Sequence, residues 1–196
     1  MTFGLSIGKI DLLLTCHFGK VLAAFKKDKF SKSLFKSLSN NLSGTHSIQW
    51  GISNESSAID VLKQEENVEV TPTGLWLSNS GLLGALPDGL VGSNYTVEVK
   101  CPWKYRNKNL IAEIDVDHTY IVYKINGNLI VNKKHPYWDQ IQGQLYLTNR
   151  EFCYLFIWTP EQVLIAVVEK DTKWAINLEI LEQFFIQKYI PYHTEG

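Results

Sequence analysis

Apolar and polar positions along this chain repeat with two periods, and each period predicts one class of element. A repeat of about 3.6 residues is typical of an amphipathic helix. The stretches with this repeat are 11–30, 53–70, 135–149 and 174–190. In the third stretch Trp138, Ile141 and Leu145 follow helical spacing, while Gln140 and Gln144 share a neighbouring face.

Short apolar or alternating runs bounded by turn residues predict the strands. They lie at 95–101, 151–159 and 162–170, with hairpins over 73–92 and 119–133. The second hairpin turns at Asn126-Gly127, a residue pair that favours tight hairpin turns. The Ser/Asn-rich stretch 36–47 is predicted as a loop. This order of helices and strands predicts an α/β fold with a mixed central sheet flanked by helices, in a single domain over residues 1–196.

The composition narrows the class of protein. The chain has 196 residues, 45% of them hydrophobic, and a formal net charge of -1. A protein that coats nucleic acid would carry a strongly basic surface, whereas a nuclease offsets a basic groove with an acidic metal site. Cys16, Cys101 and Cys153 are scattered and form no CxxC pair, which indicates reduced thiols. No apolar run approaches the length of a membrane span, so we expect a soluble intracellular protein.

The strand at 95–101 carries an unusual charge pattern. Alternation places Glu98 and Lys100 on one face of the strand and Val97, Val99 and Cys101 on the other. A charged pair that faces inward on a central strand is costly unless a ligand or metal engages it. The stretch is therefore either an edge strand with a wet face or the centre of a metal site.

Asp88, on the turn before this strand, adds a second carboxylate to the pattern. Mg²⁺ takes few protein ligands, and Asp88, Glu98 and the backbone carbonyl of Val99 could supply them. Lys100 would lie beside the metal as a base, as a positive charge that stabilises the reacting phosphate, or as both. By itself this pattern also arises by chance on a solvated strand face.

Four motifs occur in the order known from one family. They are "WGISNESSAI" from Trp50, "LGALPDGLV" from Leu83, "VEVKCPW" from Val97 and "HPYWDQIQGQLYLTN" from His135. Together they resemble the YqaJ-like viral recombinase and phage lambda exonuclease family, within the PD-(D/E)xK nuclease superfamily. The resemblance covers most of the chain, from about Thr15 to the last helix, and implies the restriction-endonuclease-like core of that superfamily.

The resemblance implies a role for each matched residue. Asp88 and Glu98 match the metal-binding carboxylates, and Lys100 matches the catalytic lysine. Glu55 matches a further acidic residue of the active site, and Gln140 matches a glutamine near the reacting phosphate. Without the family, Glu55 would be read as a carboxylate favoured by the helix dipole and Gln140 as a polar residue at a strand edge.

The segment 15–17 departs from the family pattern. Exonucleases of the family hold a 5′-phosphate with an arginine and with a serine of a Thr-Ala-Ser segment; here Ile10 falls near the arginine, and Thr-Cys-His replaces the segment. Lys9, Lys20 or a protonated His17 could substitute as the phosphate ligand. Equally, the 5′-end preference could be lost, which would leave a nuclease of other polarity or an endonuclease.

The stretch "PWKYRNKN" directly follows the charged strand and mixes cations with aromatic residues. Trp103, Lys104, Arg106 and Lys108 are therefore predicted to bind DNA, through phosphate contacts and base stacking. A solvated loop is the alternative.

The resemblance finally implies an activity and its partners. We expect a DNA exonuclease that uses Mg²⁺, or Mn²⁺ in its place, and degrades linear double-stranded DNA from its 5′ end during recombination or viral DNA processing. DNA ends, a single-strand annealing protein and a homotrimer are the implied partners, with residues 1–50 as a DNA-end-binding element. The alternatives are an endonuclease or a nuclease of different polarity with the same fold, and a catalytically inactive nucleic-acid-binding relative.

Overall fold

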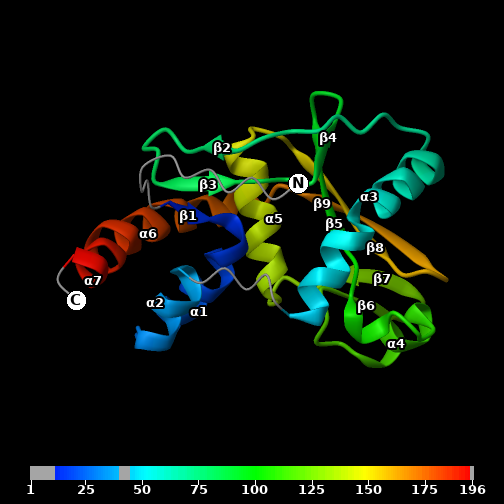
Figure 1. Cartoon of the computed structure of the whole chain (residues 1–196), viewed down its shortest axis with the longest axis horizontal. Coiled ribbons are helices and arrows are strands. Elements are labelled where there is room, and N and C mark those ends of the chain that lie inside the picture. Colours follow the sequence, from blue (N-terminus) through cyan, green and yellow to red (C-terminus); the bar gives the residue numbers. More distant parts are fainter. Residues whose placement is uncertain (1–11, 40–44, 195–196) are drawn as a thin grey trace.

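The computed structural model describes residues 12–39 and 45–194. Its helices are α1 (Phe18–Lys26), α2 (Lys32–Ser39), α3 (His46–Glu66), α4 (Leu110–Val116), α5 (Pro136–Leu147), α6 (Ile176–Phe184) and α7 (Ile190–Thr194). Its strands are β1 (Leu13–Leu14), β2 (Trp76–Leu77), β3 (Leu83–Ala85), β4 (Gly89–Val91), β5 (Tyr95–Lys100), β6 (Val122–Ile125), β7 (Asn128–Val131), β8 (Phe152–Trp158) and β9 (Val163–Glu169). This mixed α/β arrangement confirms the predicted fold class (Figure 1).

The largest sheet has the strand order β4-β5-β8-β9. Strands β5 and β8 are parallel, and the other pairs are antiparallel. Because β5 is an internal strand, its Glu98 side chain is only 2% exposed. This position excludes the reading of 95–101 as an edge strand with a wet face.

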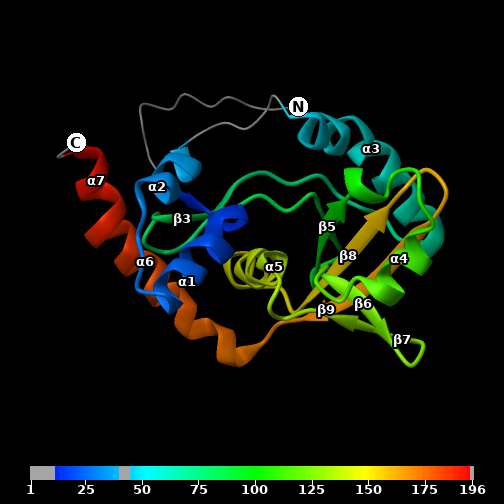
Figure 2. The ribbon, with the colours of Figure 1, turned by 90° about the horizontal axis from the view of Figure 1, so that it is seen from below.

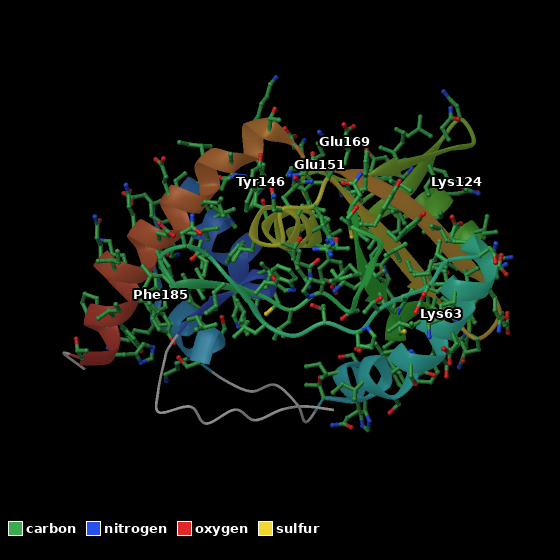
Figure 3. The ribbon with its side chains drawn as sticks, turned by 90° about the horizontal axis from the view of Figure 1, so that it is seen from above. Lys63, Lys124, Tyr146, Glu151, Glu169 and Phe185 are labelled. Atoms are coloured by element: carbon green, nitrogen blue, oxygen red, sulfur yellow. The ribbon has the colours of Figure 1, made fainter. Side chains whose placement is uncertain are left out.

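The two faces of β5 are covered by different helices. Val97 and Val99 pack with Ala58 and Leu62 of α3 in a small core on one face. On the other face α5 lies beside the sheet (Figure 2), and its side chains share the main core with those of β8. Figure 3 shows that side chains fill the space between the elements. Glu98 and Lys100 point to the α5 face, as the alternation of the sequence predicts.

The N-terminal helix predicted over 11–30 is only partly correct. Leu13–Leu14 instead forms β1, which pairs in parallel with β3, and a 3₁₀ turn, η1 (Thr15–His17), precedes α1. Pairing with a distant strand outweighs the local preference of this apolar stretch for a helix.

The loop predicted over 36–47 is wrong at both of its ends. Helix α2 extends to Ser39, and α3 already begins at His46. Phe35 of α2 stacks on Phe184 at 5.9 Å and on Tyr192 at 4.3 Å between ring centroids. Contact with the C-terminal helices stabilises this helix, and a prediction from the residues of the segment alone does not include that contact.

Most other predicted elements are confirmed, with shifted ends. Both hairpins form, and Asn126 and Gly127 have φ angles of 50° and 79° at the second turn. The closing helix of 174–190 is divided into a 3₁₀ turn, α6, a π-helical stretch and α7. Helix α4 was not predicted. In the ranges that the structure describes, no helix combines the length and the apolarity needed to cross a membrane.

Two glycines let the N-terminal segment pack closely on α5. A Cβ atom on Gly143 would lie 2.5 Å from the Phe18 ring and 2.9 Å from Thr15. A Cβ atom on Gly19 would lie 2.7 Å from the Cα of Pro136. The close approach places η1 against the helix that carries Gln140.

Candidate active site

Asp88 is fixed by the hairpin that joins β4 to β5. Its backbone N–H donates to the carbonyl of Val97 at 3.0 Å, and its Oδ2 accepts the N–H of Val99 at 2.7 Å. The next residue is Gly89, where a Cβ atom would lie 2.4 Å from Val70. Asp88 directly precedes β4, and the pairing of β4 with β5 therefore holds its carboxylate against the backbone of β5.

Glu98 is the buried centre of the site. Its Oε1 accepts hydrogen bonds from Lys100 Nζ and from Gln140 Nε2, the latter at 2.7 Å. Its Oε2 accepts a hydrogen bond from Gln144 Nε2 at 2.6 Å. Hydrogen bonds and the neighbouring ammonium offset the cost of removing this carboxylate from water.

Lys100 lies between Glu98 and the first turns of α5. Its Nζ also donates to Gln140 Oε1 at 3.3 Å and lies 4.1 Å from the centre of the Tyr137 ring. Burial alone would lower the pKa of Lys100, but the charges of Glu98, Tyr137 and Asp88 and the hydrogen bond to Glu98 together outweigh this effect and raise the pKa. The arrangement holds the side chain as an ammonium.

The carboxylates of the site repel one another. Burial, and then the charge of Glu98, raise the pKa of Asp88 well above its usual value, while Lys100 opposes the increase. Glu55 on α3 is exposed at the surface, yet partial loss of water and the charge of Glu98 raise its pKa too. Lys100 offsets only part of this negative charge. A divalent cation bound between the carboxylates would reduce the repulsion that remains.

The donor set fits a hard divalent cation with few protein ligands. Among the described residues, Asp88 Oδ1 accepts no hydrogen bond, and Glu98 Oε2 has the single donor Gln144. Each carboxylate oxygen can accept two bonds, so one position on each side chain is available for a metal. The described part of the chain has no group of three His, Cys, Asp or Glu side chains able to hold a metal ion. Two carboxylates are the number of protein ligands that Mg²⁺ typically takes, because it keeps several of its waters.

The predicted third ligand lies next to the same carboxylate. The amide of Val99 donates to Asp88, so this residue of β5 is held beside it. Coordination of a metal by the Val99 carbonyl stays a prediction.

The lysines predicted to bind DNA are engaged in ion pairs. Lys104 Nζ lies 2.6 Å from Asp117, and Lys108 Nζ lies 2.9 Å from Glu113. Asp117 ends α4 and Glu113 lies within it, so these pairs tie α4 to the preceding loop. DNA contact by either lysine would have to compete with the pair.

Trp103 and Arg106 form a cation–π contact with each other. The guanidinium carbon of Arg106 lies 3.4 Å from the centre of the Trp103 ring. Trp103 also contacts Trp50 and His46, at 5.6 Å and 6.2 Å between ring centroids. This cluster joins the 3₁₀ turn η2 (Trp103–Tyr105) to the start of α3, which carries Glu55.

The departing segment 15–17 lies close to the site. Burial and, next, the charge of Glu98 raise the pKa of the Cys16 thiol, whereas the charge of Lys100 lowers this pKa. Burial and the charge of Lys20 lower the pKa of His17, so its neutral form dominates at pH 7. Lys20 is exposed one turn further along. Lys9 and Ile10 lie outside the described residues.

Gln144 and Tyr137 complete the site, although Gln140 is the one residue of this helix whose role the family motif predicted. Both lie on the face of α5 that carries Gln140, and Gln144 is completely buried. The signal was the helical spacing of 137, 140 and 144, which places one face of the helix over Lys100.

Comparison with known proteins agrees with this geometry. The family model described as "YqaJ-like viral recombinase domain" matches residues 14–151. Nothing among the curated proteins matches the chain.

Solved structures of exonucleases share the fold. LHK-Exo in complex with dAMP is 20% identical, with a TM-score of 0.68 over 92% of this chain and 89% of that chain. The alkaline exonuclease LHK-Exo from Laribacter hongkongensis, in a second structure, has a TM-score of 0.58 at 20% identity, over 94% of this chain and 95% of that chain. A phage-related exonuclease from Haemophilus somnus 129PT is 12% identical, with a TM-score of 0.67 over 94% of this chain and 96% of that chain. These similarities show that the chain shares the fold of these exonucleases.

Proposed function

The chain belongs to the YqaJ-like viral recombinase family, and from this we propose that it is a Mg²⁺-dependent exonuclease that degrades linear double-stranded DNA from the 5′ end. The family supports a DNA exonuclease role. The observation that carries the proposal is the buried Glu98 carboxylate, bound by Lys100, Gln140 and Gln144 beside Asp88. LHK-Exo was solved with dAMP, the kind of mononucleotide that an exonuclease releases from DNA.

Asp88 and Glu98 are the residues that would hold Mg²⁺, with Mn²⁺ as a substitute. When bound, the ion would polarise the phosphoryl oxygen and lower the pKa of the attacking water. Lys100 offers a fixed positive charge for the charge that develops on the phosphate. Gln140 forms hydrogen bonds with both Lys100 and Glu98, so it fixes the position of the lysine relative to the carboxylate.

Hydrolysis of end-labelled DNA tests this function. Linear duplexes with a 5′-phosphate or a 5′-hydroxyl, and a closed circle, are incubated with Mg²⁺. We expect the linear DNA alone to disappear, and Lys100→Ala to lower kcat by about 10²-fold or more, the usual loss for one donor that stabilises charge in the transition state. Folding of the variant is checked by its circular dichroism and its Tm. Absence of cleavage with both Mg²⁺ and Mn²⁺ would overturn the proposal and favour an inactive DNA-binding relative.

The segment 15–17 motivates a second candidate, an endonuclease or a nuclease of other polarity. It lies close to Glu98 and Lys100, where its His17 is neutral at pH 7 and so is a weak ligand for a terminal phosphate. Cutting of the circle would favour this candidate over the exonuclease. Equal rates on both 5′ ends would show that the segment no longer recognises the terminal phosphate.

The remaining expectations stay predictions. The single domain over 1–196 is predicted from the sequence pattern, whereas the DNA-end-binding role of 1–50, the single-strand annealing partner and the homotrimer are predicted from the family resemblance.

A further inference from the structure

A basic hollow lies between the β6–β7 hairpin and the start of α5. Its volume is about 680 Å³. Four of the residues that line it carry nitrogen-bearing basic side chains, namely His118, Lys133, Lys134 and His135. Among the described residues that line it there is no Asp or Glu. Such a bias is notable in a chain whose acidic residues outnumber its lysines and arginines, 20 to 19.

The walls of the hollow are held together by one side chain. Asn132 Nδ2 donates to the carbonyls of Tyr120 at 3.1 Å and of Thr119 at 3.4 Å. Its Oδ1 accepts the backbone N–H of Lys134 at 3.0 Å. The loop at 118–120 and the turn at 132–135 are therefore fixed relative to each other. The shape of the hollow is thus maintained by hydrogen bonds of the fold.

The carboxylates around the hollow are already paired. Asp171 binds Lys133 at 3.1 Å, and Asp115 lies 4.0 Å from Lys124. Lys134 is exposed, and its ammonium forms no ion pair with any residue that the structure describes. Its charge therefore remains available for an anionic ligand.

The hollow reaches the candidate active site through two side chains. The ring of His135, which lines the hollow, contacts the ring of Tyr137 at 4.6 Å between centroids. The Tyr137 ring in turn lies 4.1 Å from Lys100 Nζ. Figure 1 shows the β6–β7 hairpin and α4 beside the lower end of α5, where this helix begins. A chain of phosphates that has one member at Lys100 would pass next to the hollow.

The geometry points to a DNA-backbone site in this hollow, in which Lys134 binds a phosphate of the same substrate at a distance from the one that is cleaved. The inference rests on the proposed nuclease function and deepens it, because it names a second contact of the same substrate. Recognition of phosphate carries no base preference, so the site would strengthen binding to all sequences alike.

Salt-dependent binding tests the site. Duplex binding is measured by fluorescence anisotropy on the full chain with Lys100→Ala, in EDTA so that the DNA is not cleaved, and Lys134→Ala or Lys188→Ala is added. Lys188 is an exposed lysine in the π-helical stretch Phe185–Tyr189 and serves as the matched control. Loss of one phosphate contact should raise Kd several-fold and reduce the slope of log Kd against log salt by about 1. Lys188→Ala should change neither, and Lys134→Arg should restore both.

Two substrates separate this inference from the proposed function. With the active chain, Lys134→Ala should raise KM on linear duplex but leave the hydrolysis of bis(p-nitrophenyl) phosphate unchanged, since this small diester does not reach the hollow. If the wild type degrades duplex while Lys134→Ala keeps the parent Kd and salt slope, the hollow is not a DNA site, although the nuclease proposal stands. If the wild type hydrolyses neither substrate, the nuclease proposal fails. The comparison of Kd and salt slope then decides by itself whether the hollow binds DNA.

Discussion

Glu98 shows how much a single buried carboxylate requires of its neighbours. It is 2% exposed and accepts hydrogen bonds from three side chains. Two of these donors are glutamines of α5, which stay neutral and so orient the carboxylate without cancelling its charge. Its negative charge therefore stays available to a metal, while its position is fixed.

The first prediction concerns Gln144. Gln144→Leu removes the donor to Glu98 Oε2 and leaves this buried oxygen without its partner. Loss of a hydrogen bond to a charged group should lower the free energy of unfolding by about 1.5–3 kcal/mol. We also expect kcat to fall, because Glu98 can now turn. Urea denaturation and initial rates on linear duplex measure the two effects.

Gln142 provides the matched control for this prediction. It is as buried as Gln144 and lies two residues earlier, but it binds the carbonyl of Glu169 and the N–H of Asp171, away from the site. Gln142→Leu should lower stability without lowering kcat of the folded enzyme. Equal kcat losses in both variants would show that Gln144 has only a general packing role.

At the scale of elements, α5 organises the site because its two sides meet different partners. One face presents Tyr137, Gln140 and Gln144 to β5, and Gly143 admits the ring of Phe18 from α1. The N-terminal turn η1 is thereby carried to the edge of the active site. The position of the helix, rather than a loop conformation, therefore places Gln140 and Gln144 against Glu98.

The second prediction follows from this close packing. Gly143→Ala would place a Cβ atom 2.5 Å from Phe18, so the ring or the helix must move. Such overpacking typically costs about 1–3 kcal/mol of unfolding free energy. We expect a lower urea midpoint, because α1 and η1 loosen from α5.

Gly51→Ala is the corresponding control, since it lies within α3 and has open space around its Cβ position. In a helix interior this change should leave stability unchanged or raise it by up to about 1 kcal/mol. A Gly143→Ala variant as stable as the wild type would mean that the contact between α1 and α5 is loose.

At the scale of the whole molecule, the site lies where two cores meet across one sheet. The core under α3 fixes Val97 and Val99, and the main core fixes α5 on the opposite face. Glu98 and Lys100 alternate with the two valines on the same strand. Folding of both layers is therefore needed before the carboxylates approach one another.

The third prediction is that Mg²⁺ stabilises the folded chain. Asp88 and Glu98 repel each other, and a cation bound only in the folded state adds about 2.7 kcal/mol at a hundredfold excess over Kd. We expect the Tm of the wild type to rise with MgCl₂ concentration. Asp88→Asn should remove this response and raise the Tm in the absence of metal, because the repulsion is gone while the bond from Val99 remains possible. A wild-type Tm that does not change with MgCl₂ or MnCl₂ would argue against the site.

The sequence by itself determined the features that depend on near neighbours. The alternation in 95–101 predicted the strand with Glu98 and Lys100 on one face, the 3.6-residue repeat predicted α5, and Asn126-Gly127 predicted the hairpin turn. The order of the four motifs identified the family. All of these signals are local, because backbone periodicity and turn geometry are set within a few residues.

Only the tertiary structure decided which side chains meet. It turned Leu13–Leu14 into a strand beside β3 and paired Lys104 and Lys108 with acidic residues of α4. It also brought Gln144 to Glu98, 46 positions earlier in the chain. Such contacts depend on the packing of distant elements, whose energies outweigh the weak local preferences of a short segment, and no pattern within one segment contains them.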